Sequence, residues 1–212
     1  RFGLSASRAP VLLPLILPQL QQHYPGIEVQ IEEGRTKQLE SVLKMGTIDL
    51  AFLVPPLKDD SIECHIFSKE EIVLAVPKVY NTRSRSHPSQ GSLPWINLQD
   101  LSDYPFLLYD SNNRLCDFTK QLFLKEQFLP VSHQTFKDIR VLIGLARAGM
   151  GILVLPEAYA DPKYELDYYS IGPQGSFRSL GLGYPPGLYR SKATECFAQF
   201  FINLLNRKQS TI

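Results

Sequence analysis

Small hydroxyl-bearing side chains recur at four points where an apolar segment gives way to a helical pattern. These junctions are Ser5 to Arg8, Gly34 to Thr36, Ser111 to Asn113 and Thr135 to Lys137. A helix N-terminus offers free N–H groups and a partial positive charge, and a Ser or Thr hydroxyl adds another donor. Together they suit a carboxylate, phosphate or sulfate. The same residue types are also the preferred N-caps of helices, so each junction alone has two interpretations.

Signatures of catalysis are weak. The segment Gly3 to Ser7 reads "GLSAS" and lacks the second glycine of the G-x-S-x-G motif. The glycines of "RAGMGI" follow a helical pattern and do not precede one, so they indicate a C-cap and not a phosphate loop. The histidines are scattered without ligand spacing; they are His23, His65, His87 and His133. We therefore expect no catalytic residue, no metal and no cofactor, and a protein that is not an enzyme.

Composition is that of an ordinary globular protein. The chain has 212 residues, 44% of them hydrophobic and 20% charged, with a net charge of +1. This charge gives no global field toward nucleic acid or acidic lipid. The cysteines Cys64, Cys116 and Cys196 are odd in number and far apart, which favours a reducing compartment. No signal peptide or membrane-spanning run is visible, so we expect a cytoplasmic protein without membrane contact.

Strand and helix patterns alternate in the first third of the chain. "FGLS" predicts a short strand, and the spacing of apolar residues predicts a helix over Arg8–Tyr24. Pro14 and Pro18 inside that helix are expected to cost backbone hydrogen bonds and to bend it. The segments "IEVQIEE", "IDLAFLV", "SIECHIF" and "EIVLAV" predict further strands, with a short helix around Leu39–Leu43. This order is typical of parallel β-α-β units.

The composition changes at Lys78. The stretch from Lys78 to Asn97 is polar, basic and rich in Pro and Ser, which indicates a mobile excursion at a lobe boundary. Beyond it, "PFLLY" and "GILVLP" predict strands, and helices are expected around Leu115–Phe123 and over Asp138–Ala148. "LGLGY" predicts a late strand, followed by an amphipathic C-terminal helix. In a parallel sheet the strand C-termini share one edge, so the junctions should line a common ligand site.

Three blocks of the sequence resemble the effector-binding domain of LysR-type bacterial transcriptional regulators. They read "LLPLILPQLQQHYPGIEVQIEEGRTKQLESVLKMGTIDLAFL", "INLQDLSDYPFLLY" and "IRVLIGLARAGMGILVLPEAY". They occur in the order the family has and are spread over residues 12–159 of the 212-residue chain. The resemblance implies an α/β fold of periplasmic-binding-protein type 2 architecture, with two Rossmann-like lobes joined by two crossover strands. The first lobe would comprise residues 1–77 and 183–212, and the second residues 78–182.

The resemblance also implies a small-molecule ligand between the lobes. Its contacts in the family fall on Ser7 and Thr36 of the first lobe and on Ser111, Asn112 and Phe136 of the second. Ser5 joins them from its junction, where Ser5 and Ser7 are also expected to cap the first helix. Arg8 and Arg35 either pair with a ligand carboxylate or point to solvent. We expect an organic anion as the effector, with the ligand itself unidentified.

Partners are implied in the same way. Regulators of this family carry an N-terminal winged helix-turn-helix, and nothing before Arg1 shows one, so DNA would be bound only through a missing N-terminal domain. A homodimer or tetramer is expected. A solute-binding protein of a transporter, with the same fold, remains the main alternative. A dehydratase-like or deaminase-like enzyme using the same cleft is a weaker one, because no candidate base is evident.

Overall fold

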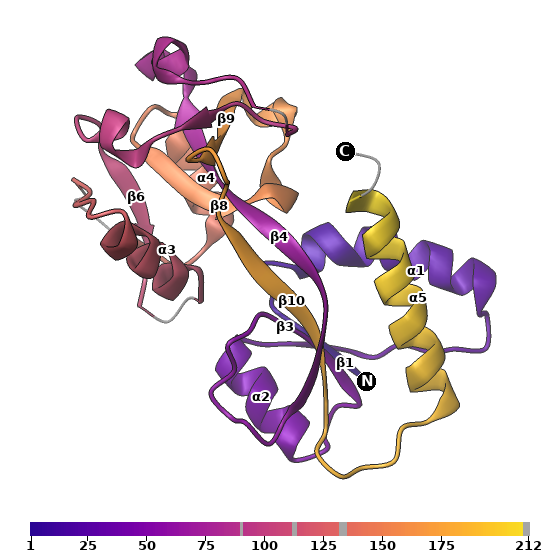
Figure 1. The fold of residues 1–212 in the computed structure, drawn as a ribbon. Helices are drawn as coiled ribbons and strands as arrows, with labels where there is room; N and C mark the ends of the chain where they lie inside the picture. Colours follow the sequence, from indigo (N-terminus) through magenta and orange to yellow (C-terminus); the bar gives the residue numbers. More distant parts are fainter. Residues whose placement is uncertain (90, 112–113, 132–134, 210–212) are drawn as a thin grey trace. The chain divides into compact units, whose positions relative to one another are not determined.

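The chain folds into two compact units (Figure 1). A computed structural model describes residues 1–89, 91–111, 114–131 and 135–209. Unit 1 comprises Arg1–Lys69 and Ser179–Ile212, and unit 2 comprises Glu70–Arg178. The chain leaves unit 1 inside β4 (Glu63–Pro77) and returns inside β10 (Phe177–Tyr184), so two strands join the units. The lobe limits at 77 and 183 stay a prediction.

Unit 1 is an α/β layer structure. Strand β1 pairs in parallel with β2 and β3, and β10 pairs antiparallel with β3 on the far side. The sheet order is β2-β1-β3-β10-β4. The bounds of its other elements are β1 Phe2–Leu4, α1 Ala9–His23, β2 Ile31–Glu33, α2 Thr36–Lys44, β3 Leu50–Leu53 and α5 Lys192–Gln209. The expected β-α-β pattern is therefore confirmed in this unit.

The alternation of side chains along β3 divides the core of unit 1 between two faces of the sheet. Leu50 and Phe52 belong to one cluster, which also holds buried residues of α1 and α5. Ala51 and Leu53 belong to the other, which holds Leu39 and Leu43 of α2. Figure 1 shows α1 and α5 lying beside each other, and the two helices are in contact. Successive residues of a strand point to opposite faces, so one apolar strand anchors helices on both sides.

The prolines of α1 lie on its exposed side. Pro10, Pro14 and Pro18 are exposed, while the buried face is made by Ala9, Leu12, Ile16 and Leu20. The missing N–H of Pro14 would have bonded the Pro10 carbonyl, and that of Pro18 the Pro14 carbonyl. Both orphaned carbonyls therefore lie on the stripe that faces water, which can satisfy them. This spacing explains how one helix tolerates two internal prolines.

Unit 2 repeats the α/β plan around a second set of strands. Strands β6, β7 and β8 are parallel, and β4 pairs antiparallel with both β8 and β9. Its helices and remaining strands are β5 Trp95–Ile96, β6 Phe106–Tyr109, α3 Arg114–Lys125, β7 Thr135–Phe136, α4 Ile139–Arg147, β8 Ile152–Pro156 and β9 Leu166–Ile171. Short 3-10 helices cover Lys78–Tyr80, Thr82–Arg85, Leu98–Leu101, Glu157–Tyr159 and Pro162–Tyr164.

Two sequence expectations about elements were wrong. "SIECHIF" and "EIVLAV" are not separate strands but one strand, β4, because the polar residues between them continue the extended chain from unit 1 into unit 2. Thr135 and Phe136 form strand β7 and not the turn that precedes a helix. The basic segment after Lys78 also contains two 3-10 helices and β5, and its Arg83 forms an ion pair with Asp167 of β9 at 2.9 Å.

Candidate functional site

The parallel strands of unit 1 bring two of the predicted junctions together. Leu4 at the end of β1 is in register with Glu33 at the end of β2, and the Gly34 N–H donates to the Leu4 carbonyl at 3.1 Å. The turns that follow the two strands are therefore neighbours at one edge of the sheet. We call Ser5, Ser7, Arg35 and Thr36 at this edge the unit 1 strand-end cluster.

The first turn of α1 uses its own backbone donors. The Ser5 carbonyl accepts from the N–H groups of Arg8 at 2.8 Å and Ala9 at 3.0 Å, and the Val11 N–H bonds the Arg8 carbonyl at 3.0 Å. Pro10 has no N–H to give. The expectation that the α1 N-terminus offers backbone donors to an anion therefore loses its support.

The capping role expected of the two serines is also revised. The N-cap of α1 is Arg8, in a right-handed helical conformation. Ser5 Oγ accepts from the Arg8 N–H at 3.4 Å, which is a long hydrogen bond, and it lies 3.1 Å from Ser7 Oγ. Ser5 is half-buried and Ser7 is exposed. The two hydroxyls therefore lie together beside the first turn of α1.

Arg8 does not point to solvent. Its residue is 4% exposed, and the guanidinium carbon lies 5.6 Å from the centroid of the Phe52 ring. Phe52 belongs to the core cluster beneath α1. This cation–π contact anchors the start of α1 on the sheet. Of the two interpretations of Arg8, the solvent-facing one is excluded, and a ligand role stays a prediction.

The N-terminus of α2 is better suited to an anion. Its N-cap Arg35 is exposed, and the Arg35 N–H is bonded by the side chain of Gln38 at 3.0 Å. The first-turn N–H groups of Thr36 and Lys37 have no partner within the helix. The half-buried Thr36 adds a hydroxyl beside them. This end of α2 therefore combines a cation, a hydroxyl and helix N–H groups.

The other two junctions meet in unit 2. Tyr109 of β6 is in register with Phe136 of β7, and the Asp110 N–H donates to the Phe136 carbonyl at 2.9 Å. Ser111, which is exposed, thus follows β6 next to the end of β7. We call Ser111 and the half-buried Phe136 the unit 2 strand-end pair. Asn112, predicted as a contact from the same turn, lies outside the described residues.

Sequence reasoning missed the role of Asp138. This residue caps α4 by accepting from the Arg140 N–H at 2.9 Å, and the Arg140 guanidinium donates to the same carboxylate at 2.6 Å. The Arg140 hydrogen bonds lower the pKa of Asp138, so the N-terminus of α4 already holds an anion. The signal was present, because an Asp just before an apolar helical pattern is a typical N-cap.

The histidines that the structure describes serve local contacts. His23 bonds the Gln19 carbonyl at 2.8 Å, His65 bonds Glu63 at 2.6 Å, and His87 stacks on Trp95. His133 lies outside the described residues. Within the described ranges, no group of three His, Cys, Asp or Glu side chains is placed to hold a metal ion. The same residues include no helix with the length and apolar character needed to cross a membrane.

Comparison with known families assigns the chain to a class. The family model described as the LysR substrate binding domain matches residues 1–206. The chain therefore belongs to the LysR substrate-binding domain family, which confirms the resemblance seen in the sequence. Among curated proteins, it is 26% identical over 211 residues to the transcriptional dual regulator GltC of Bacillus subtilis (strain 168), covering 98% of this chain and 67% of GltC.

A second regulator and two solved structures are also similar to this chain. The dual regulator OxyR of Escherichia coli (strain K12) is 26% identical over 194 residues, covering 87% of this chain and 59% of OxyR. A cysteine mutant of Corynebacterium glutamicum OxyR superposes with a TM-score of 0.80 at 23% identity, over 97% of this chain and 63% of that one. The effector-binding domain of QuiR in complex with shikimate gives 0.78 at 19% identity, covering 97% and 96%. The predicted fold class is therefore confirmed, and the chain corresponds to part of each full-length regulator.

Proposed function

We propose that this chain is the sensing domain of a LysR-type transcriptional regulator and that it binds a small organic anion at the unit 1 strand-end cluster. The observation that supports this proposal most strongly is the convergence of Ser5, Ser7, Arg35 and Thr36 at one edge of a parallel sheet. Helix N–H groups, hydroxyls and a guanidinium all stabilise a carboxylate. The named relatives are transcription regulators, which disfavours the solute-binding alternative.

In the full-length regulator, ligand binding would bias the equilibrium between conformations that differ in their effect on DNA. DNA would be contacted by an N-terminal helix-turn-helix outside these residues, and the protein would act in the cytoplasm as a homodimer or tetramer. The domain would release its ligand unchanged and act as no enzyme. Arg8 would hold the start of α1 in place, and Ser111 and Phe136 are the candidate ligand contacts within unit 2.

A thermal-shift screen tests the proposal. Carboxylates, including shikimate, are compared with the matching amides or alcohols, together with sulfate and phosphate. A ligand at a hundred times its Kd stabilises the folded state by about 2.7 kcal/mol. We expect carboxylates, and not their neutral analogues, to raise the Tm by several degrees.

Two variants locate the effect. Ser7→Ala and Thr36→Ala each remove one hydroxyl donor, so the affinity for the anion should fall by about tenfold or more. Ser7 is exposed and is not the N-cap, so the free energy of unfolding of Ser7→Ala should change by less than about 0.5 kcal/mol. Ser41→Ala, on an exposed part of α2 away from its N-terminus, is the control and should bind as the parent does. Unchanged affinity in both variants would contradict the proposed site.

A further inference from the structure

Unit 2 contains a cavity that plays no part in the proposed sensing site. Its volume is about 400 Å³, within the range of about 300–1,000 Å³ that is typical of small-molecule sites. The walls come from β4, β5, β9, the start of β10 and the loop that precedes β5. All of the lining residues belong to unit 2. The cavity is therefore complete within one compact unit.

The floor of this cavity is built by three adjacent strands. Ser170 of β9 is in register with Val73 of β4 on one side and with Trp95 of β5 on the other. Glu71 lies two residues before Val73 and forms a side-chain hydrogen bond with Ser170. A carboxylate, a hydroxyl and an indole therefore share one wall.

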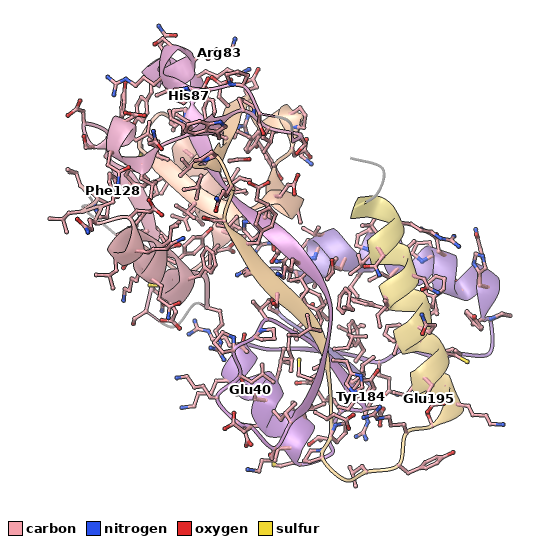
Figure 2. All side chains as sticks on the ribbon, in the orientation of Figure 1. Glu40, Arg83, His87, Phe128, Tyr184 and Glu195 are labelled. Atoms are coloured by element: carbon pink, nitrogen blue, oxygen red, sulfur yellow. The ribbon has the colours of Figure 1, made fainter. Side chains whose placement is uncertain are left out.

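Trp95 is held in position by His87. The backbone N–H of Trp95 donates to the His87 carbonyl at 3.0 Å, and the His87 backbone N–H donates to the Trp95 carbonyl at 2.8 Å. The imidazole ring of His87 stacks on the indole, with centroids 4.1 Å apart and an interplanar angle of 22°. Figure 2 labels His87 in unit 2 next to the segment that carries Arg83. The indole is thus a preorganised wall of the cavity.

The turn between β9 and β10 closes on the carboxylate. Gly175 has a φ of +66°, and a Cβ atom placed on it would lie 2.6 Å from Glu71 Oε1. Only a glycine lets the backbone approach the carboxylate so closely. Phe177, whose residue is 53% exposed, lines the cavity beside this turn. Two aromatic side chains thus line a cavity that contains one carboxylate.

The charge at the cavity is negative. Among the described residues that line the cavity, Glu71 is the only charged side chain, and none is Lys, Arg or His. A second carboxylate lies near the lining, because the Ser92 hydroxyl donates to Glu157 at 3.5 Å. Burial raises the pKa of Glu71, and the charge of Glu157 raises it further. A half-buried carboxylate with a like charge nearby is stabilised when a cation binds.

We infer that this cavity is a second ligand site, which takes a small organic amine: the ammonium group bonds the Glu71 carboxylate and the apolar part packs on Trp95 and Phe177. Aromatic faces attract cations, and a carboxylate supplies a charge-assisted hydrogen bond. Anions are excluded, so this site and the anion-binding cluster of unit 1 take ligands of opposite charge. The inference is independent of the proposed sensing function.

Tryptophan fluorescence reads this site directly, because Trp95 is the single tryptophan of the chain. The domain is titrated with benzylamine, benzyl alcohol and benzoate at neutral pH. We expect benzylamine to change the emission saturably, benzyl alcohol to bind about tenfold more weakly or worse, and benzoate to have no saturable effect. Equal binding of benzylamine and benzyl alcohol, or no saturable change with benzylamine, would overturn the inference.

The variant Glu71→Gln should lose the preference for the amine over the alcohol. The pKa of Glu71 is raised, so the neutral amide should leave the Tm equal to that of the parent or higher. The matched control is Glu126→Gln, an intermediate-exposure glutamate of unit 2 that does not line the cavity, and it should bind as the parent does.

Phe177→Ala provides a second variant in case Glu71→Gln fails to fold. Phe177 is exposed over half its surface, so its truncation should leave the fold intact. We expect weaker binding of benzylamine and of benzyl alcohol together, with the preference for the amine kept. Unchanged affinity for benzylamine in Phe177→Ala, or an unchanged preference for the amine in Glu71→Gln, would contradict the assignment.

Discussion

Glu70 and Arg178 form a buried ion pair at the point where both connecting strands change units. Glu70 Oε1 and Arg178 Nε are 2.7 Å apart, and the two side chains are 6% and 8% exposed. Glu70 is the first residue of unit 2 on β4, and Arg178 is the last one before β10 enters unit 1. A buried charge without its partner is costly, so this pair fixes the relation of the two strands to each other.

Replacing one partner should therefore be strongly destabilising. We expect Arg178→Met to lower the free energy of unfolding by about 3–5 kcal/mol, measured by urea denaturation. The control is Arg83→Met, which breaks an ion pair in the same unit where the Arg83 side chain is 71% exposed. That change should cost less than about 1 kcal/mol. Similar losses in the two variants would show that burial is not the cause.

Glu63 makes a different, pH-dependent contribution. It accepts from Arg190 and from His65, and these bonds lower its pKa from 4.5 to about 2. The folded state thus binds the proton less tightly than the unfolded state does. The resulting stabilisation is complete above pH 4.5 and is lost as the pH falls toward 2.

The Tm of the parent and of Glu63→Gln, measured against pH, tests this contribution. The parent should have the higher Tm by a constant difference from pH 5 to 7, with the difference shrinking as the pH falls from about 4.5 toward 2. A difference that stays constant down to pH 2 would show that the ion pairs of Glu63 do not set its pKa.

At the scale of elements, glycines let α2 lie close to the sheet of unit 1. A Cβ atom on Gly183 of β10 would lie 2.5 Å from Leu53 and 3.0 Å from Leu43 of α2. Gly3 of β1 is equally crowded, by Ile48 and Leu39. In "LGLGY" the leucine side chains therefore pack on the face of the sheet that α1 and α5 cover. The glycines leave the opposite face free for the close approach of α2.

Two Gly→Ala substitutions should consequently have opposite signs. Gly183→Ala overpacks the core and should cost about 1–3 kcal/mol of the free energy of unfolding. Gly144→Ala lies on an exposed part of α4, where an added Cβ meets nothing within 4 Å, and should stabilise by about 0.4–1 kcal/mol. Urea denaturation of both variants is the measurement. If Gly183→Ala left the free energy of unfolding unchanged, α2 would have to move away from β10 without destabilising the fold.

Elements with strong periodicity were predictable from the sequence, and those set by tertiary contacts were not. Apolar spacing placed α1, α2 and α5 and the buried strands β3, β6 and β8 correctly. β4 was split in two because Ser68–Glu70 looks like a break, although Glu70 is buried by its pairing with Arg178. β7 and β5 have two residues each, and only their neighbours hold them extended.

The shared sheet edge of the junctions after β1 and β2 was predictable from the sequence, because the strand C-termini of parallel strands lie at one edge. The ligand contacts at that edge stay a prediction. Which N–H groups remain available depends on local backbone geometry. Arg8 takes a helical conformation and Ser5 turns its carbonyl inward, so α1 consumes its donors while α2 keeps them. No residue pattern signals that difference.

At the scale of the whole molecule, each unit carries its own set of strand-end side chains. The unit 1 strand-end cluster has hydroxyls, a guanidinium and a helix N-terminus, whereas α4 of unit 2 has its N-terminus occupied by Asp138. We therefore propose that unit 1 recognises the anion. The variants Ser111→Ala and Phe136→Ala test separately whether residues of unit 2 contribute to anion binding. We expect each to reduce the affinity for the anion less than Thr36→Ala does.

Anion binding at the unit 1 strand-end cluster is tested most directly by an NMR titration of the ¹⁵N-labelled domain with the carboxylate that gives the largest thermal shift. We predict that the largest amide shift changes fall on Ser5, Ser7, Arg35 and Thr36, and that they are strongly reduced in Thr36→Ala. Changes that leave these four residues unaffected and centre elsewhere would contradict the assignment of the anion site to unit 1.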